Sequence, residues 1–228
     1  MHTLLTNQKY FIAAIFMTKE EKEEFKWITV MLAFVIFVFF IFQNFSPYIF
    51  DALILDSSRI FSHPWSLITY IFLHGNLTHL LSNLFSLVMF GSILEKIVGY
   101  KKFLFVFFSA GIFSGVAGSF FYNSMIGASG AIFGVVGTLV AIRPKMVVLA
   151  FGAPLPLVTA VIMWAALDLG GVFYPTSIGN IGHLAGLFVG IAIGISIRPK
   201  YKLPEQKKKT RFKLDEEYFR RWEEKYMK

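Results

Sequence analysis

The feature that most constrains this chain is a stretch of 171 residues, 27–197, in which ten side chains are charged. A soluble domain carries about one charged residue in four, so this stretch cannot cover a surface that faces water. In a bilayer, by contrast, helices satisfy their own backbone groups and apolar side chains need no water. We therefore predict an all-α membrane protein and exclude a cytosolic enzyme and a disordered chain. The absence of cysteine excludes a disulfide-stabilised domain and thiolate metal sites.

The remaining charged residues gather at the two ends of the chain. Residues 1–26 carry four Lys and four Glu, and residues 198–228 carry twelve basic and six acidic side chains. Basic residues after a membrane helix hold that end in the cytoplasm and attract anionic headgroups. We expect a cytoplasmic N-terminal segment (1–26), a membrane core (27–197) and a basic cytoplasmic tail (198–228). The tail, with an amphipathic pattern between Phe212 and Tyr226, favours the surface of the lipid bilayer over nucleic acid as its partner.

Apolar runs between polar residues predict six transmembrane spans, each near the roughly 20 residues that cross a bilayer. The spans lie near residues 27–45, 76–94, 103–122, 128–142, 146–166 and 179–197. The fourth span is short. The connection 46–75 is long and apolar, and we expect it to lie in the membrane interface.

Basic residues in the turns assign the two sides of the membrane. Those in the turns after the second and fourth spans are Lys96, Lys101, Lys102, Arg143 and Lys145. The positive-inside rule places these turns and the tail in the cytoplasm. We therefore expect a multi-pass protein of the plasma membrane, with both termini cytoplasmic and the connection 46–75 on the outer face.

Three polar residues fall at a similar depth in three different spans. Polar side chains are costly in a bilayer and therefore mark candidate functional sites. At about 1.5 Å per helical residue, Asn83, Ser129 and His183 lie roughly 18–22 Å from the cytoplasmic ends of their spans. In a core about 30 Å thick, all three lie about 10 Å below the outer surface.

Glycines at helical spacing predict close packing of the fourth and sixth spans. Small residues at this spacing let helix backbones approach one another in lipid. They are Gly130 and Gly134 in the fourth span and Gly182, Gly186 and Gly190 in the sixth. Because Ser129 and His183 lie beside these glycines, such packing would bring the hydroxyl to the imidazole.

A hydroxyl in contact with an imidazole can carry out acyl transfer. The imidazole takes the serine proton, and fixed N–H donors stabilise the oxyanion that forms. We predict a Ser129–His183 dyad, with donors from the backbone at the helix start, from Asn83 and from His79 one turn above it. Asp168 lies on the outer connection after the fifth span and could orient His183, but we favour a solvated loop residue. No cofactor and no metal is expected.

Four motifs combine these residues with their neighbours. They are His79-x-x-x-Asn83, Gly91-x-x-x-Glu95-x-x-x-Gly99, Gly127-x-Ser129-Gly130 and Gly182-His183-x-x-Gly186-x-x-x-Gly190. Their order and spacing resemble the rhomboid intramembrane serine proteases across residues 27–197. The resemblance implies a rhomboid-like bundle of six transmembrane helices, a water-filled cavity open to the outer face, and cleavage of transmembrane segments of other membrane proteins.

The resemblance also implies roles by position. Ser129 corresponds to the nucleophile and His183 to the general base. The oxyanion and substrate-binding positions correspond to Asn83, His79, Gly127 and Phe133, whose ring would lie under the histidine. Glu95 corresponds to a structural acidic residue. The family commonly carries Trp-Arg in its first outer loop, whereas this chain has Trp65-Ser66, a departure that bears on the loop and not on the dyad.

Two other functions compete with proteolysis. A non-catalytic rhomboid-like adaptor would need neither Ser129 nor His183, and this chain retains both. A metal or proton carrier would use the histidines of the outer half, but the spans hold almost no carboxylates to accompany them. These histidines are His63, His74, His79 and His183. The sequence leaves the substrate and the oligomeric state open.

Overall fold

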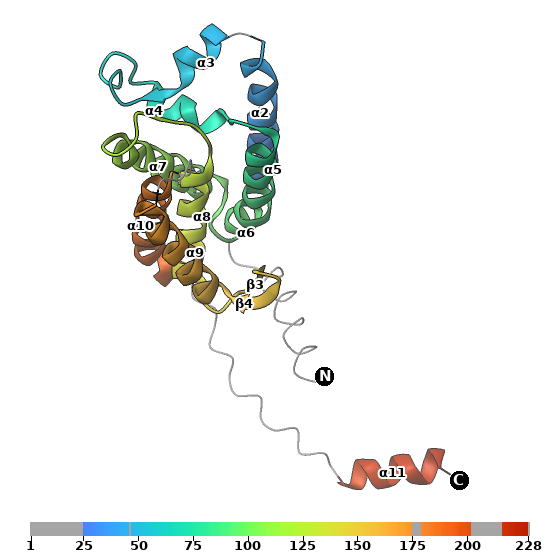
Figure 1. The fold of residues 1–228 in the computed structure, drawn as a ribbon. Coiled ribbons are helices and arrows are strands. Elements are labelled where there is room, and N and C mark those ends of the chain that lie inside the picture. Colours follow the sequence, from blue (N-terminus) through green and yellow to red (C-terminus); the bar gives the residue numbers. More distant parts are fainter. Residues whose placement is uncertain (1–24, 46, 175–178, 202–215, 228) are drawn as a thin grey trace.

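The computed structural model, drawn in Figure 1, describes residues 25–45, 47–174, 179–201 and 216–227. Most of them are helical. The longer helices are α2 (Ile28–Gln43), α5 (Leu77–Ser86), α6 (Ser92–Val98), α7 (Tyr100–Ser119), α8 (Ser129–Ile142), α9 (Leu157–Val172), α10 (Asn180–Ile197) and α11 (Glu216–Tyr226). Shorter pieces are α3 (Pro47–Leu53), α4 (Ser66–Thr69), η1 (Tyr70–Phe72), η2 (Leu87–Gly91) and η3 (Arg198–Tyr201). The strands are β1 (Leu55–Asp56), β2 (Ser124–Met125), β3 (Val147–Ala150) and β4 (Ala153–Pro156).

Helix α8 lies at the centre of the bundle. Eleven of its fourteen residues are buried, and Figure 1 shows α7, α9 and α10 on one side of it and α2 with α5 on the other. The short helices α3 and α4 cover one end of the bundle, and the β3–β4 hairpin lies at the opposite end. The last residue of α8, Ile142, leads into the β3–β4 hairpin, so the first residue, Ser129, lies toward the α3–α4 end.

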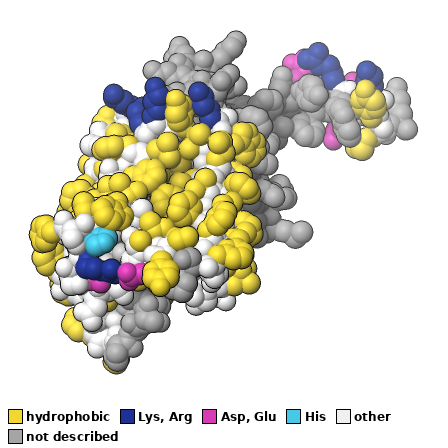
Figure 2. Space-filling view, turned by 90° about the horizontal axis from the view of Figure 1, so that it is seen from above, with side chains coloured by type: hydrophobic (Ala, Val, Ile, Leu, Met, Phe, Trp, Pro, Cys, Tyr) yellow, Lys and Arg dark blue, Asp and Glu magenta, His cyan; other side chains and the backbone are white. Residues whose placement is uncertain are grey.

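Within the part of the chain that the structure describes, three helical stretches are long and apolar enough to cross a membrane: Leu77–Val98, Tyr100–Ser119 and Asn180–Tyr201. The shorter apolar helices α2, α8 and α9 lie at or near the other three predicted spans. Figure 2 shows a broad face of hydrophobic side chains, with a row of Lys and Arg at one edge and a small cluster of charged side chains and a histidine at the opposite edge. This distribution suits a lipid-facing belt between two polar rims. The count of six spans stays a prediction.

The predicted fifth span, 146–166, has the wrong bounds. Residues 147–156 form the antiparallel hairpin β3–β4, with Ala150 opposite Ala153, and the helix runs from Leu157 to Val172. The turn residues Phe151 and Gly152 both have positive φ, which matches the twist of a tight hairpin. Apolarity alone does not distinguish a short buried strand from the first turns of a helix, so the span was placed too early in the chain.

Helices α8 and α10 pack backbone to backbone through their glycines. A Cβ atom on Gly186 would lie 2.0 Å from the Gly130 carbonyl oxygen, and one on Gly190 would lie 1.9 Å from that of Gly134. The Thr138 hydroxyl donates across the same contact to the Gly190 carbonyl oxygen at 2.9 Å. No side chain larger than hydrogen fits at these two α10 positions without separating the helices.

Glu95 joins α6 to the start of α2. Its carboxylate accepts hydrogen bonds from the backbone N–H groups of Ile28 (3.1 Å) and Thr29 (2.9 Å) and from the Thr29 hydroxyl (2.7 Å). The first N–H groups of a helix have no partner within that helix, and they favour a negative charge. The buried carboxylate is thus satisfied by the end of a neighbouring helix, which suits a structural role for Glu95.

The described part of this connection, residues 47–75, is held together by hydrogen bonds between its own residues. Arg59 pairs with Asp51 and Asp56, both at 2.9 Å, and the Trp65 indole N–H donates to the Ala52 carbonyl oxygen at 2.9 Å. Ser66, at the position where the rhomboid proteases commonly carry arginine, is buried, and its hydroxyl has no hydrogen-bond partner among the described residues. In this loop it is the guanidinium of Arg59 that joins two segments, the one at Asp51 and the one at Asp56.

The predicted amphipathic helix of the tail is described only in part. Phe212 lies outside the described residues, and α11 covers Glu216–Tyr226. Within α11, Arg221 pairs with Glu217 at 3.1 Å, one turn earlier. An exposed i,i+4 pair of this kind stabilises a helix by roughly 0.3–0.5 kcal/mol.

Candidate active site

Ser129 begins α8, and the segment before it is held from two sides. Strand β2 pairs with β1, Met125 lying opposite Leu55, and the Gly127 N–H donates to the Tyr70 carbonyl oxygen at 2.9 Å. The N–H groups in the first turn of a helix have no partner within that helix. Since Ser129 is the first residue of α8, its hydroxyl lies beside N–H donors that can bind an anion.

His183 lies in the first turn of α10 and faces Ser129. Its Nε2 atom is 2.8 Å from the Ser129 Oγ atom. The imidazole stacks on the ring of Phe133, one turn along α8, with centroids 4.5 Å apart and planes inclined by 7°. Stacking on one face and a hydroxyl at the edge fix the orientation of the imidazole.

Asp168 completes a chain of three polar groups. Its Oδ1 atom is 3.0 Å from the Nδ1 atom of His183, and its side chain is 9% exposed against 13% for the histidine. The expectation of a solvated connection was wrong, because α9 extends to Val172 and carries Asp168 inside the bundle. The signal in the sequence was a lone carboxylate within an apolar run, which is costly unless it is paired.

The predicted oxyanion donors lie around Gly127 and α5. A Cβ atom on Gly127 would lie 2.8 Å from Nε2 of His79, so the His79 ring rests against this glycine, two residues before Ser129. Gly127 has φ +113°, a conformation that glycine adopts without steric penalty. The amide nitrogen of Asn83 donates to the His79 carbonyl oxygen at 2.8 Å, and its second N–H is a further donor.

Asn76 and Gln43 hold the start of α5 in place. The Asn76 side chain accepts a hydrogen bond from the His79 N–H at 2.8 Å and caps the helix. Gln43 exchanges two hydrogen bonds with the backbone of His74, at 2.5 and 3.1 Å. The ring of His74 lies 4.9 Å from that of His79, so α2 also supports the histidine next to the candidate site.

The histidines of the outer half do not form one cluster. His63 packs on Trp65 in the loop, with ring centroids 4.8 Å apart, while His183 bonds to Ser129 and Asp168. Among the described residues, no group of three or more His, Cys, Asp or Glu side chains is placed to hold a metal ion. The geometry therefore gives no support to a histidine-based metal carrier.

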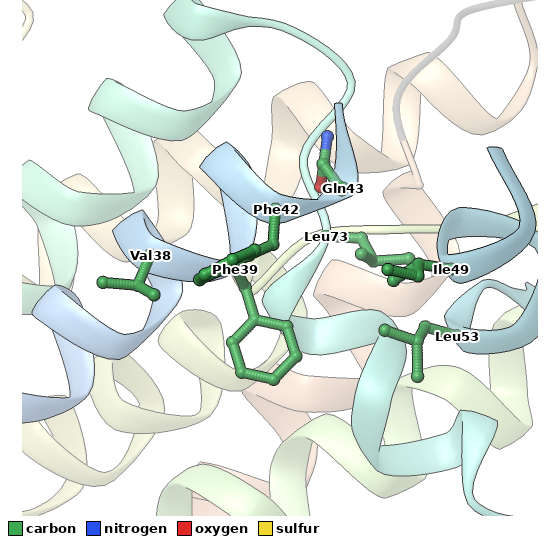
Figure 3. Close-up of a pocket in the computed structure, with 7 residues that line it drawn as sticks. All are labelled: Val38, Phe39, Phe42, Gln43, Ile49, Leu53 and Leu73. Carbon is green, nitrogen blue, oxygen red and sulfur yellow. The ribbon is translucent and has the colours of Figure 1, made fainter. Parts of the chain in front are cut away.

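The structure also has an apolar pocket of about 230 Å³, whose lining does not include Ser129, His183 or Asp168. Figure 3 shows its lining, which comes from α2, α3 and the segment before α5: Val38, Phe39, Phe42, Gln43, Ile49, Leu53 and Leu73. Gln43, its one polar member, is already bonded to His74. The pocket has no group suited to nucleophilic or acid–base chemistry.

Known proteins with similar sequences carry the name of one family. The chain matches the Rhomboid domain over residues 62–200. It is 35% identical over 140 residues to the rhomboid protease GluP of Bacillus subtilis (58% of this chain, 26% of that protein). It is 30% identical over 154 residues to RHOMBOID-like protein 1 of Arabidopsis thaliana (64% of this chain, 38% of that protein). It is 28% identical over 134 residues to the rhomboid protease GlpG of Haemophilus influenzae (58% of this chain, 69% of that protein).

The matched region covers more than half of the chain and includes the helices from α5 to α10. The chain spans about a quarter to two fifths of the length of GluP and RHOMBOID-like protein 1. The apolar helices and the family match together make it an integral membrane protein in a lipid bilayer. The chain belongs to the rhomboid family.

Proposed function

We propose that this protein is an intramembrane serine endopeptidase that hydrolyses peptide bonds within or near transmembrane segments of other membrane proteins. The observation that carries the proposal is the 2.8 Å contact between the Ser129 Oγ and His183 Nε2 atoms, contributed by two different helices. Rhomboid proteases among the similar proteins support a peptidase reaction.

The proposed reaction proceeds through an acyl-enzyme. His183 Nε2 takes the Ser129 proton as Oγ bonds to the scissile carbonyl carbon, which forms a tetrahedral oxyanion. The C–N bond then breaks, and the proton on Nε2 goes to the leaving amine. Water attacks the ester, gives its proton to Nε2 and forms a second oxyanion; the Ser129–acyl bond breaks, and the serine regains its proton.

Donors around the start of α8 suit the oxyanion. Backbone N–H groups of the first turn have no partner within α8, the ring of His79 lies against Gly127, and Asn83 has a second amide N–H. Preorganised donors of this kind are each worth roughly 10²–10³ in kcat in serine proteases. We propose Asn83, His79 and the backbone as this oxyanion hole.

The depth of the site limits the choice of substrate. The proposed orientation puts Ser129 about 10 Å below the outer surface, with both termini in the cytoplasm and a hydrated cavity above the dyad. A substrate helix keeps its carbonyl groups in i→i−4 hydrogen bonds and must unwind before attack. We therefore propose that substrates carry Gly, Pro or β-branched residues at the level of the outer leaflet, with a small residue at the cleaved position.

The test is cleavage of a labelled transmembrane reporter by purified protein in liposomes, together with labelling by a fluorophosphonate probe. We expect wild type to cleave the reporter and to be labelled at Ser129. Ser129→Ala should abolish both, and His183→Ala should lower the cleavage rate at least about 10³-fold. Product masses identify the cleaved bond. A folded wild type that neither cleaves reporters with weakened helices nor reacts with the probe would indicate a non-catalytic adaptor instead.

A further inference from the structure

We propose that Asp168 is the positioning residue of a Ser129–His183–Asp168 triad, an inference that rests on the proposed protease function. The carboxylate lies on α9 and bonds to the imidazole nitrogen that does not face the serine. The three groups thus come from three helices and form one continuous hydrogen-bonded chain.

The bond to Asp168 determines which imidazole nitrogen carries the proton. An ionised carboxylate only accepts hydrogen bonds, so the 3.0 Å contact requires the proton on Nδ1 of His183. Nε2 is then free to accept the Ser129 proton across 2.8 Å. Without the carboxylate, the imidazole can also take the other tautomer, in which Nε2 is a donor and cannot act as the base.

The charge of Asp168 also acts during the reaction. When His183 accepts the serine proton it becomes an imidazolium, and a carboxylate at 3.0 Å stabilises that cation. Both side chains are largely shielded from solvent, which strengthens the attraction between the two charges. Phe133 stacks on one face of the ring and cannot supply charge.

The surroundings of Asp168 argue against a purely structural ion pair. Residues 157–172 contain no other charged side chain, and His183 is the hydrogen-bond partner that the structure shows for it. A lone carboxylate is costly inside an apolar bundle. Packing of α9 on α10 has other contacts available, such as Asn180 against Gly171.

The test compares Asp168→Ala and Asp168→Asn with Asn180→Ala, which alters another contact between α9 and α10, that of Asn180 with Gly171. We expect both Asp168 variants to lower kcat at least about 100-fold with KM changed less than about threefold, and to slow fluorophosphonate labelling of Ser129 to a similar degree. Asn180→Ala should keep the labelling rate within about threefold of wild type, whatever its effect on Tm. Formate should partly restore the labelling rate of Asp168→Ala and leave His183→Ala unchanged.

The outcomes separate this inference from the function on which it rests. If wild type is labelled and cleaves the reporter, while folded Asp168 variants are labelled at the wild-type rate, the triad is wrong and a dyad remains. The triad is equally wrong if Asn180→Ala slows labelling as much as Asp168→Ala, because the effect would then be loss of helix packing. If wild type itself is neither labelled nor active, the protease proposal has failed.

Discussion

At the scale of single residues, the site depends on positions that tolerate one kind of side chain. Gly127 combines φ +113° with the ring of His79 at the place where a Cβ atom would lie. Phe133 supplies the flat surface on which His183 stacks. These two residues shape the space on either side of Ser129 without taking part in proton transfer.

Gly127→Ala should impair both stability and catalysis. The new Cβ atom would lie 2.7 Å from the His79 ring, and the strained backbone alone costs about 1–3 kcal/mol. We expect Tm to fall and kcat/KM to drop about 10- to 100-fold, since each 1.4 kcal/mol corresponds to about a factor of ten. Reporter cleavage and thermal unfolding in detergent measure the two effects.

Gly152→Ala is the matched control for that variant. Gly152 has φ +76°, but no heavy atom lies within 4 Å of the place that a Cβ atom would take, and the residue belongs to the β3–β4 turn. It should lose stability through the backbone alone and keep kcat/KM within about twofold. Equal losses of activity in the two variants would show that the His79 contact is irrelevant to the reaction.

At the scale of elements, the contact between α8 and α10 sets the distance between hydroxyl and imidazole. Both catalytic candidates lie in the first turn of their helices. The glycines that follow them let the two backbones meet, with Gly186 against Gly130 and Gly190 against Gly134. The position of His183 relative to Ser129 is therefore a property of the whole helix pair.

Gly190→Ala should disturb the site from a distance. Its Cβ atom would lie 1.9 Å from the Gly134 carbonyl oxygen, which belongs to rigid backbone, so the helices must move apart at a cost of about 1–3 kcal/mol. We expect a lower Tm and a slower labelling of Ser129. Gly170→Ala on α9, with no heavy atom within 4 Å of the new methyl group, should leave labelling unchanged and should not lower Tm. A Gly190→Ala variant with the wild-type Tm and labelling rate would argue against the packing.

The loop 46–75 should show a pH-dependent contribution to stability. The hydrogen bond and charge of Arg59 lower the pKa of Asp51 below its ordinary 3.8. Hydrogen bonds from Ser58, followed by Arg59, lower the pKa of Asp56. Groups with a lowered folded-state pKa stabilise the fold above the ordinary value, and this contribution disappears as the pH falls through the lowered values.

The measurement is the difference in Tm between wild type and Arg59→Gln as a function of pH. The difference should be positive near about pH 6 and shrink toward zero as the pH falls through the lowered pKa values of the two carboxyls, because protonated carboxyls no longer attract the guanidinium. Asp51 is exposed to solvent and Asp56 is partly exposed, so high salt should also reduce the difference. A difference that stays constant with pH would show that Arg59 acts through packing alone.

At the scale of the whole molecule, the arrangement of charge suits one orientation in a bilayer. The hydrophobic face in Figure 2 separates a row of basic side chains from a small cluster of mixed charge. The turn between α8 and β3, which carries Arg143 and Lys145, leads into the β3–β4 hairpin at the end opposite α3 and α4 (Figure 1). From the positive-inside rule we propose that the loop, and the candidate site beneath it, face the outside of the membrane.

Cysteine labelling tests this orientation directly, because the chain has no native cysteine. Ser62 and Lys145 are both exposed and lie in the loop and in the turn after α8, respectively. A membrane-impermeant maleimide should label Ser62→Cys in intact cells and Lys145→Cys only after permeabilisation. The reverse pattern would place the candidate site on the cytoplasmic side.

The sequence by itself determined the class of this protein and the helices that carry its candidate site. Hydropathy and glycine spacing are local properties of the sequence. They therefore identified both helices of the candidate site, α8, which begins at Ser129, and α10, which carries His183 in its first turn. They also indicated that these two helices pack, and the structure places hydroxyl and imidazole in contact. The role of that contact in catalysis stays a proposal.

Only the tertiary structure decided what surrounds that pair. The start of the fifth helix depended on the pairing of β3 with β4, which an apolar run does not reveal. Asp168 lies beside His183 because α9 packs against α10 at one particular rotation about its axis. The Asn83 amide donates one of its hydrogen bonds to a carbonyl group of its own helix. Such details arise from contacts between residues far apart in the chain, and a local pattern contains no information about them.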